Sequence, residues 1–316
     1  MQISVAMCTY NGQKYLEEQL NSIAVQSLLP IELVICDDGS ADDTAEIVRQ
    51  FSSTAPFPVH FFKNERNLGS TKNFEKAVSL CVGELIALSD QDDVWVPEKL
   101  ARLAAVLAAN PSVGGVFSNA QLIDGASRPL ERLLWNEVPA TPRTATGTVA
   151  IDTLLRHNIV TGATLIFRSS LRSTMLPFGP EWIHDGWIAW IIVLYSRLSY
   201  LSEPLICYRI HTSQQVGVPQ DSSFWQRINR ARRAGVESQL LLARQFESLR
   251  NFWREHPTDR YATLDDDLKE KIRHSYLRAQ LPSGKLRRFL LIVRNVSGYR
   301  RFSIGWISMA KDLLQQ

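Results

Sequence analysis

The sequence of 316 residues predicts an α/β protein with a mostly parallel central sheet, helices on both sheet faces and a C-terminal helical region. Two observations predict this class. Short apolar runs alternate with amphipathic helical patterns through the first part of the chain, and a basic segment with helical spacing follows the last run. Right-handed crossovers bring the carboxyl ends of parallel strands to one edge of a sheet. The polar residues that follow these strands are therefore expected to share one cleft.

The elements are predicted in order along the chain. Strands are expected at residues 3–8, 31–36, 59–62 and 85–88, with helices between them near 15–23, 44–51 and 71–81. Later apolar runs predict strands near 163–168 and 205–210, and an apolar helix opens at His184. Gly39 permits a tight turn after the second strand, and Ser40 is suited to cap the helix that follows.

Three carboxylates stand within four residues directly after the fourth strand. They are Asp90, Asp92 and Asp93. Carboxylates this close repel one another unless a cation lies among them, and hard divalent ions prefer oxygen ligands. The cluster therefore predicts a divalent-metal site, and the alternative is a polar loop that happens to be acidic.

Four motifs stand in a specific order: Thr9-Tyr10-Asn11-Gly12, Asp37-Asp38-Gly39-Ser40, Asn67-Leu68-Gly69 and Ser89-Asp90-Gln91-Asp92-Asp93-Val94-Trp95. Together they resemble a bacterial family 2 glycosyltransferase with the Rossmann-like GT-A fold. The last motif is most similar to the rhamnosyltransferase-like branch, which builds cell-surface polysaccharides such as O-antigen. The resemblance covers roughly residues 1–215. It implies inverting transfer of a sugar from a nucleoside diphosphate, with a divalent metal on the diphosphate.

The resemblance also implies roles for the first two motifs. Thr9, Tyr10 and Asn11 match the turn that holds the nucleotide base. Asp38 matches the carboxylate that contacts the base or the ribose. The favoured donor is dTDP-rhamnose rather than a UDP- or GDP-sugar, and the implied acceptor is a glycan or lipid-linked glycan.

Asp90 and Asp92 occupy the two acidic positions of the DxD-type motif, with Asp92 as the direct ligand of Mg²⁺ or Mn²⁺ and Asp90 also at the nucleotide sugar. The metal would neutralise the diphosphate as the glycosidic bond breaks. Arg66 and Lys72 are predicted to support the phosphates, and the alternative is that each is a solvated surface cation. His211, in a Tyr-Arg-x-His pattern, either completes the metal site, touches the diphosphate, or has a structural or substrate-contacting role.

The acceptor half is expected to begin with residues 125–147, which lack periodicity and predict a long loop. Asp185 is the candidate general base, since inverting transfer needs a group that takes the acceptor hydroxyl's proton and the family places its base at the matching position. A helix cap is the alternative role. Trp182 and Trp187 flank it and are predicted to offer flat faces to the acceptor sugar. His184 is predicted to orient Asp185 or bind acceptor, or else to pack against its neighbours.

Charge divides the protein in two. Residues 1–221 carry 16 Lys/Arg and 23 Asp/Glu, whereas the remaining residues carry 19 and 9. Apolar and aromatic side chains recur at helical spacing over residues 224–228, 240–253, 285–294 and 302–314. Such basic helices suit an anionic membrane surface, and they suit equally a bundle that packs on the catalytic domain or forms a homodimer. No nucleic-acid recognition motif accompanies the charge.

The predicted organisation is a catalytic domain followed by a basic helical region. The boundaries are 1–124 for nucleotide-sugar binding, 125–215 for acceptor binding and 216–316 for the helical region. The first residues form a strand without a basic start, and no run of about twenty apolar residues occurs. We therefore expect a cytoplasmic protein, peripheral on the inner face of the cytoplasmic membrane. Cys8, Cys36 and Cys207 are expected to be buried free thiols in strands.

Two other classes of function stay open. A metal-dependent sugar nucleotidyltransferase would show a glycine-rich, lysine-bearing loop after the first strand, and Thr9-Tyr10-Asn11-Gly12 is not such a loop. A non-catalytic scaffold that binds nucleotide sugar could use the first acidic motifs and would not need Asp185. The Gln-x-x-Arg-Trp signature of the superfamily's processive polymerases does not occur, which favours a single-addition transferase.

Overall fold

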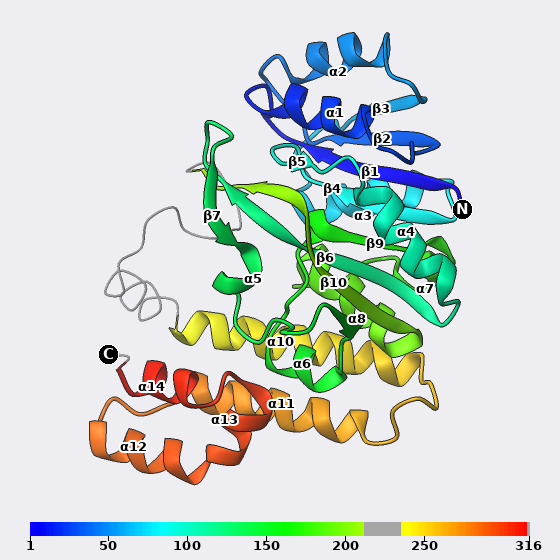
Figure 1. The fold of residues 1–316 in the computed structure, drawn as a ribbon. Coiled ribbons are helices and arrows are strands. Elements are labelled where there is room, and N and C mark those ends of the chain that lie inside the picture. The colour runs from blue at the N-terminus through cyan, green and yellow to red at the C-terminus, as the bar shows by residue number, and fades with distance from the viewer. Residues whose placement is uncertain (212–234, 315–316) are drawn as a thin grey trace. The chain divides into compact units, whose positions relative to one another are not determined.

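The computed structural model describes residues 1–211 and 235–314, and the chain divides into two compact units (Figure 1). The first unit consists of Met1–Val149, Val160–Phe178 and Ile183–Val218, and the second of Ala150–Ile159, Gly179–Trp182 and Pro219–Gln316. The second unit thus includes two short segments from the predicted acceptor half. The functional roles predicted for residues 1–124, 125–215 and 216–316 stay predictions.

Within the described residues, the first unit is built on one ten-stranded sheet. The order is β3-β2-β1-β4-β9-β6-β10-β5, with β7 beside β6 and β8 beside β10. The strands are β1 (Ile3–Thr9), β2 (Glu32–Asp37), β3 (Val59–Lys63), β4 (Leu85–Ser89), β5 (Val94–Trp95), β6 (Val113–Ile123), β7 (Pro129–Leu133), β8 (Thr146–Thr148), β9 (Leu165–Arg168) and β10 (Arg197–Arg209). The predicted α/β class with one central sheet is confirmed.

The pairing of the strands changes across the sheet. β3, β2, β1 and β4 are parallel neighbours, and their register sets Thr9 beside Asp37 and Met7 beside Ser89. The carboxyl ends of β1, β2 and β4 therefore share one edge, as the sequence predicts. β6 and β10 are also parallel, whereas β9 runs antiparallel to β4 and β6 and β5 runs antiparallel to β10. The antiparallel pairs belong mostly to the second half of the unit.

Helices cover the sheet. Those of the first unit are α1 (Leu16–Ala24), α2 (Thr44–Ser52), α3 (Ser70–Leu80), α4 (Lys99–Ala109), α5 (Leu134–Glu137), α7 (Arg172–Met175) and α8 (His184–Tyr195), with 3-10 turns η1 (Gly162–Thr164) and η2 (Ser169–Leu171). α3 packs on β1 and β2, while α4 and α8 pack on β6 (Figure 1). α8 is buried on nearly all sides from Gly186 to Leu194, as a helix without a polar face should be.

Residues 125–147 do not form the long loop that the sequence predicts. This segment contains β7, α5 and the start of β8, and each is short. β7 pairs with β6, and the ring of Trp135 packs 5.7 Å from that of Phe117 on β6. Order in this segment comes from pairing and packing against a distant strand. Elements of three to five residues are too short to show periodicity of their own, so the sequence pattern missed them.

The cysteines are free thiols, as predicted. Cys36 is buried on β2, whereas Cys8 on β1 and Cys207 on β10 are only partly buried. Cys81, which follows α3, is also buried.

The second unit is helical. Its described helices are α6 (Ile151–Arg156), α10 (Gly235–Glu255), α11 (Leu264–Ala279), α12 (Lys285–Arg294), α13 (Val296–Phe302) and α14 (Trp306–Leu314). α10 packs along α11, and α13 contacts α6, α11 and α14. The predicted C-terminal helical region is confirmed for its described part, and the pattern at residues 224–228 lies outside the described residues. Among the residues described, no helix is both long and apolar enough to span a membrane.

Candidate active site

Four carboxylates gather at the carboxyl edge of the sheet, around the phenol of Tyr208. Asp90, Asp92 and Asp93 follow β4 directly, and Asp185 lies in the first turn of α8. Burial raises the pKa of Tyr208, and the charges of all four carboxylates raise it further. Because such influence weakens with distance, the structure brings Asp185 to the acidic motif from a distant part of the chain.

Asp90 is one of two carboxylates in this group whose pKa is raised. Burial raises its pKa to about 7, and the charges of Asp92 and Asp185 contribute to the rise. The amine of Lys99 is fully buried nearby and acts in the opposite direction. Burial lowers the pKa of Lys99 in turn, against the charges of Asp93 and Asp90. A single buried amine therefore faces several carboxylates, and the site has an excess of negative charge.

Asp92 and His211 lie within hydrogen-bond distance of each other, and their role as metal ligands stays a prediction. His211 Nε2 lies 2.8 Å from Asp92 Oδ2, and the ring of Tyr15 packs against His211 with centroids 4.9 Å apart. Asp93 differs from Asp92, because it is fully buried and its Oδ1 accepts the backbone N–H of Arg209 at 3.0 Å. Asp93 Oδ2 is buried and has no hydrogen-bond partner among the described residues. Burial and the neighbouring carboxylates raise the pKa of Asp93.

The fit of this corner to a divalent ion depends on what else would bind the ion. No group of three or more His, Cys, Asp or Glu side chains within residues 1–211 and 235–314 is arranged to hold a metal alone. An ion that binds together with a diphosphate needs only one or two protein ligands, because phosphate oxygens and water supply the others. The Asp92–His211 pair, beside the excess negative charge at Asp90, fits such an ion.

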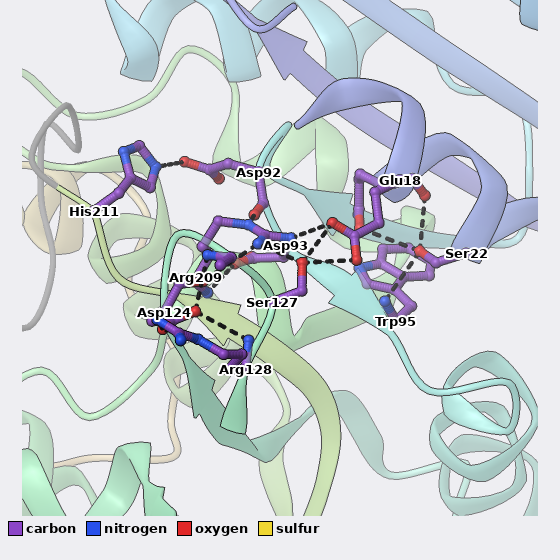
Figure 2. Close-up of polar contacts among 12 residues, drawn as sticks. Glu18, Ser22, Asp92, Asp93, Trp95, Asp124, Ser127, Arg128, Arg209 and His211 are labelled. Atoms are coloured by element: carbon purple, nitrogen blue, oxygen red, sulfur yellow. Dashed lines mark hydrogen bonds and ion pairs between the residues drawn. The ribbon is translucent and has the colours of Figure 1, made fainter. Parts of the chain in front are cut away.

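Arg209, the last residue of β10, ties the acidic loop to two other parts of the chain (Figure 2). Its Nε donates to the carbonyl of Asp92 at 2.7 Å, which holds the backbone of the acidic motif. Nη2 donates to Glu18 Oε2 on α1 at 2.6 Å, and Nη1 donates to Ser127 Oγ at 2.8 Å. The guanidinium also lies 4.5 Å from the centroid of the Tyr15 ring. The Arg209 side chain is fully buried, whereas its partner Glu18 is 44% exposed.

The turn after β1 is held by the end of β2. Thr9 Oγ1 donates to Asp37 Oδ1 at 2.9 Å, and Ser40 Oγ donates to the same carboxylate at 2.5 Å. Ser40 Oγ also accepts the backbone N–H of Asn11 at 2.8 Å. Asn11 adopts a positive φ of 48°, a conformation that asparagine tolerates better than most residues. Thr9 and Asn11 therefore lie at the predicted edge, and their contact with a base stays a prediction.

Gln91 joins the same turn to the acidic motif. The backbone N–H of Tyr10 donates to Gln91 Oε1 at 2.8 Å, and Gln91 Nε2 donates to the carbonyl of Tyr10 at 3.0 Å. A Cβ on Gly12 would lie only 2.3 Å from Gln91 Oε1, so the glycine makes room for this side chain. The ring of Tyr10 is exposed beside it. Gln91 is a site residue that the sequence analysis missed.

Asp38 turns both carboxylate oxygens into the protein. Oδ1 accepts the backbone N–H of Leu68 at 2.7 Å, and Oδ2 accepts that of Gly69 at 2.9 Å. Asn64 Nδ2 donates to Oδ1 at 2.9 Å. Gly69 has a φ of 82°, which favours glycine. Asp38 therefore orders the Asn-Leu-Gly turn, and its predicted contact with the base or ribose stays a prediction.

Arg66 and Lys72 line a cavity of about 890 Å³ on the side of α3. The other residues that line it are Asn67, Leu68, Glu75, Lys76, Ser79, Leu176 and Pro177. Lys72 Nζ is bonded to the Glu75 carboxylate at 2.8 Å, so its charge is already compensated. None of the four site carboxylates is among the described residues that line this cavity. The structure thus groups Arg66 with Lys72 without joining them to the acidic motif.

His184 is packed, in line with the alternative that the sequence left open. Its ring stacks on Phe74 with centroids 4.0 Å apart, and burial lowers its pKa to about 3. Gly162 approaches it closely, since a Cβ there would lie 2.7 Å from His184 Nε2 and 3.6 Å from the Cβ of Asp185. His184 is therefore a neutral side chain that supports the start of α8 next to Asp185.

Trp182 and Trp187 do not present exposed rings, contrary to the expectation. Trp187 is almost fully buried, and its Nε1 donates to the carbonyl of Met175 at 2.8 Å. Trp182 is also buried, donates to the carbonyl of Gln245 at 2.9 Å and packs edge-on against Phe246. Apolar burial drives both rings inward, where their N–H groups find carbonyl partners. An acceptor-binding role for either ring is untested.

Residues 4–173, more than half of the chain, match the family described as glycosyl transferase family 2. The chain belongs to glycosyl transferase family 2. The match contains all of the first four motifs, and it ends before α8, so Asp185 lies outside it.

Named relatives of this family 2 chain include an uncharacterised glycosyltransferase of Nostoc sp. strain PCC 7120. It is 29% identical over 214 residues, which cover 67% of this chain and 65% of that protein. A dTDP-rhamnosyl transferase of Shigella flexneri is 36% identical over 108 residues, which cover 33% of this chain and 37% of that protein. The chain thus spans less than two thirds of the length of these relatives.

A solved structure shares the fold of this family 2 chain. The mannosyltransferase PcManGT of Pyrobaculum calidifontis, in complex with GDP-Man and Mn²⁺, matches with a TM-score of 0.54 and 20% identity over 99% of this chain and 85% of that chain. At this identity the likeness shows the fold alone.

Proposed function

We propose that this protein is a metal-dependent inverting glycosyltransferase that moves one sugar from a nucleoside-diphosphate donor to a hydroxyl of a growing surface polysaccharide. The observation that supports it most is that, in addition to burial, the charge of Asp185, on α8, acts together with that of Asp92 to raise the pKa of both Asp90 and Tyr208. Such a group combines a corner of excess negative charge, suited to a cation and a diphosphate, with a carboxylate from a separate helix. In this proposal, residues 1–124 bind the donor and residues 125–215 bind the acceptor.

Asp92 and His211 would hold the Mg²⁺ or Mn²⁺ ion, with Asp90 next to them. When bound, the ion supplies positive charge for the diphosphate leaving group. Asp90 needs that charge, because burial and two neighbouring carboxylates raise its pKa to about 7. A cation nearby favours the ionised carboxylate. Arg209 keeps the backbone of Asp92 in place through its 2.7 Å bond.

Asp185 would act as the general base. It lies in the first turn of α8, next to the buried His184 and close to Gly162. A side chain at Gly162 would collide with His184, so the glycine allows the close packing that holds the start of α8 and Asp185 in place. In the proposed step, the acceptor oxygen attacks the anomeric carbon, Asp185 takes the hydroxyl proton, and the bond to the diphosphate breaks with its electrons leaving on phosphate oxygen.

The proposed donor is dTDP-rhamnose and the proposed acceptor a glycan or lipid-linked glycan. The Asp-Gln-Asp-Asp-Val-Trp motif and the likeness to the dTDP-rhamnosyl transferase of Shigella flexneri support this choice. That likeness covers only a third of the chain, and the matched 108 residues are too few to include the whole site. The donor base and sugar are therefore to be tested against other nucleotides.

The first test is calorimetric titration of the purified protein with dTDP, UDP and GDP, each with and without Mn²⁺. We expect Mn²⁺-dependent binding of dTDP above the other two nucleotides. Tighter binding of UDP or GDP would replace the donor but keep the transferase. A failure of all three nucleotides to bind with Mn²⁺ present would remove the basis for the proposal.

The second test is Asp185→Asn, measured for both donor binding and sugar transfer. Transfer should fall by roughly 10²- to 10⁴-fold, because proton abstraction is lost, while dTDP binding in the presence of Mn²⁺ stays within a few fold of the unmodified protein. Unchanged transfer would exclude Asp185 as the base. Asp152→Asn, in the first turn of α6, is the matched control and should transfer normally.

A further inference from the structure

Helix α12 exposes most of its large apolar side chains to solvent, whereas an ordinary surface helix buries them. Its buried residues are Arg288 and Ile292. Its largest apolar side chains face solvent instead, with exposed fractions of 72% for Leu286, 47% for Phe289, 47% for Leu290 and 46% for Val293. Their spacing at i, i+3, i+4 and i+7 places all four on one face of the helix. We call these four residues the α12 stripe.

The inner side of α12 is held by specific polar contacts. Arg288 Nε donates to the carbonyl of Pro282 at 2.7 Å, and Arg288 is buried next to Asp312. The Asp312 carboxylate is itself bonded to Arg278 at 2.6 Å and to Tyr299 Oη at 2.7 Å. A rotation of α12 that buried its stripe would pull Arg288 out of this network. The stripe therefore stays exposed, because the opposite face of α12 is held in place by the contacts of Arg288.

Helix α14 packs against α12 and adds large apolar surface. Trp306 is 76% exposed and Ile307 is 47% exposed at its first turn. An exposed tryptophan is costly in water and is enriched at the boundary between water and lipid headgroups, where one part of the ring is apolar and the N–H is hydrated.

The surroundings of the stripe are cationic. Residues 283–311 contain seven Lys/Arg and no Asp or Glu. On α12 itself, Lys285, Arg287 and Arg294 are exposed beside the stripe. The next acidic residue, Asp312, is buried in its contacts with Arg278 and Tyr299, so it does not offset this charge at the surface.

We propose that α12, with the first turn of α14, is a docking face for the surface of an anionic lipid bilayer. The stripe would enter the headgroup boundary while the flanking lysine and arginines meet lipid phosphates. Charge selects this occupant over a second copy of the chain. A twofold interface would set the same cationic face against itself, and like charges across an interface oppose association. This inference goes beyond the proposed reaction and does not depend on it.

Co-sedimentation of the full chain with vesicles tests the proposal. One set of vesicles is phosphatidylcholine alone, and the other is phosphatidylcholine mixed with phosphatidylglycerol. We expect binding to the mixed vesicles, with roughly fivefold weaker partitioning for each exposed cation removed, as in Arg287→Gln or Arg294→Gln. The double variant Leu286→Glu with Phe289→Glu should lose at least tenfold in partitioning. Added salt should weaken the binding of the unmodified protein.

A matched control is available in the first unit. Val25 and Leu29 are 63% and 43% exposed, so Val25→Glu with Leu29→Glu makes the same change in charge at similar exposure. This control should sediment like the unmodified protein. Calorimetric dTDP titration of all variants separates the docking face from the proposed reaction. A variant that loses vesicle binding but binds nucleotide normally tests the docking face alone.

Several outcomes would overturn the docking face. Equal binding to both kinds of vesicle would remove the role of charge, and an equal loss in the control pair would remove the role of α12. No sedimentation of the unmodified protein with either vesicle would reject the proposal. A dimer in analytical ultracentrifugation that dissociates in Leu286→Glu with Phe289→Glu would assign the stripe to a second copy instead.

Discussion

Arg209 is a single buried side chain on which the shape of the acidic corner depends. It bonds to the backbone of Asp92, to Glu18 on α1 and to Ser127, and no part of its side chain reaches water (Figure 2). A lysine keeps the charge but cannot make this set of contacts, because it lacks the planar fork of the guanidinium. Arg209 is therefore expected to be a positioning residue rather than a catalytic one.

We predict that Arg209→Lys destabilises the protein by about 2 kcal/mol, as expected for lost hydrogen bonds to a buried charge. Because the Asp92 backbone loosens, Mn²⁺-dependent nucleotide binding should weaken roughly 10- to 100-fold. Chemical denaturation and calorimetry measure the two effects. Arg102→Lys, at an exposed pair with Glu203, is the control and should change neither quantity much. Nucleotide binding that is unchanged in Arg209→Lys would show that Arg209 serves stability alone.

The burial of His184 leads to a prediction about how the stability of the protein depends on pH. Burial lowers its pKa from 6.5 to about 3, so between these values an unfolded chain takes up a proton that the folded protein does not. Stability therefore falls as pH decreases from 6.5 toward 3, with a slope of up to about 1.4 kcal/mol per pH unit from this residue. Above pH 6.5 His184 contributes no slope.

His184→Phe should flatten that dependence. Phenylalanine keeps the stack on Phe74 and has no proton to gain, so the free energy of unfolding should fall less steeply with acid in this variant. Denaturation midpoints measured from neutral pH down to about pH 4 give the slope. The control is His256→Phe at an exposed histidine. If the two variants have the same acid slope as the unmodified protein, burial of His184 is not what sets it.

At the scale of elements, the ends of the parallel strands organise one another. Asp38 at the end of β2 bonds to the backbone of Leu68 and Gly69, which lead into α3. Gln91 after β4 likewise bonds to the backbone of Tyr10 after β1. Each strand end thus supports the turn after a neighbouring strand. The predicted donor-binding turns are therefore supported by cross-strand contacts as well as by their own residues.

Asp38→Asn tests this dependence. An amide can replace only one of the two acceptor oxygens and brings its N–H₂ toward a backbone N–H, so we predict a loss of about 1–3 kcal/mol in stability. Nucleotide binding should weaken as well, because the Asn-Leu-Gly turn loses its anchor. Thermal unfolding and calorimetry measure these effects. Asp43→Asn, an exposed residue without a side-chain capping bond, should behave normally. A stable Asp38→Asn protein with weak binding would favour direct contact with the nucleotide.

At the scale of the whole molecule, the two units are not consecutive in the chain. The second unit includes Ala150–Ile159 and Gly179–Trp182, which lie between segments of the first. In the second unit Leu154 and Leu155 of α6 are buried, and α6 contacts α13. A cut near residue 215 would remove α13, and the buried apolar side chains of α6 would therefore become exposed.

We predict that a fragment of residues 1–215 is less soluble and unfolds at a lower temperature than the full chain. Burial of a leucine side chain stabilises a protein by about 2 kcal/mol, and in the fragment both Leu154 and Leu155 lose packing partners. Light scattering and thermal unfolding of the fragment check this. Leu154→Ser with Leu155→Ser in the same fragment should restore part of its solubility. A monomeric fragment as stable as the full chain would show that the first unit folds independently.

The sequence by itself determined the family, the α/β class and the order of the strand–helix units, because local periodicity and short motifs carry these properties. It also placed Thr9, Asp38, Asp90 and Asp92 at one sheet edge, since parallel strands with right-handed crossovers leave little choice. Tertiary structure decided the rest. The inward turn of Trp187, the ordered segment at residues 125–147, the anchoring role of Arg209 and the outward stripe of α12 all depend on partners far away in the chain. Packing against such partners overrides local preference, and a single sequence does not reveal which distant side chains will meet.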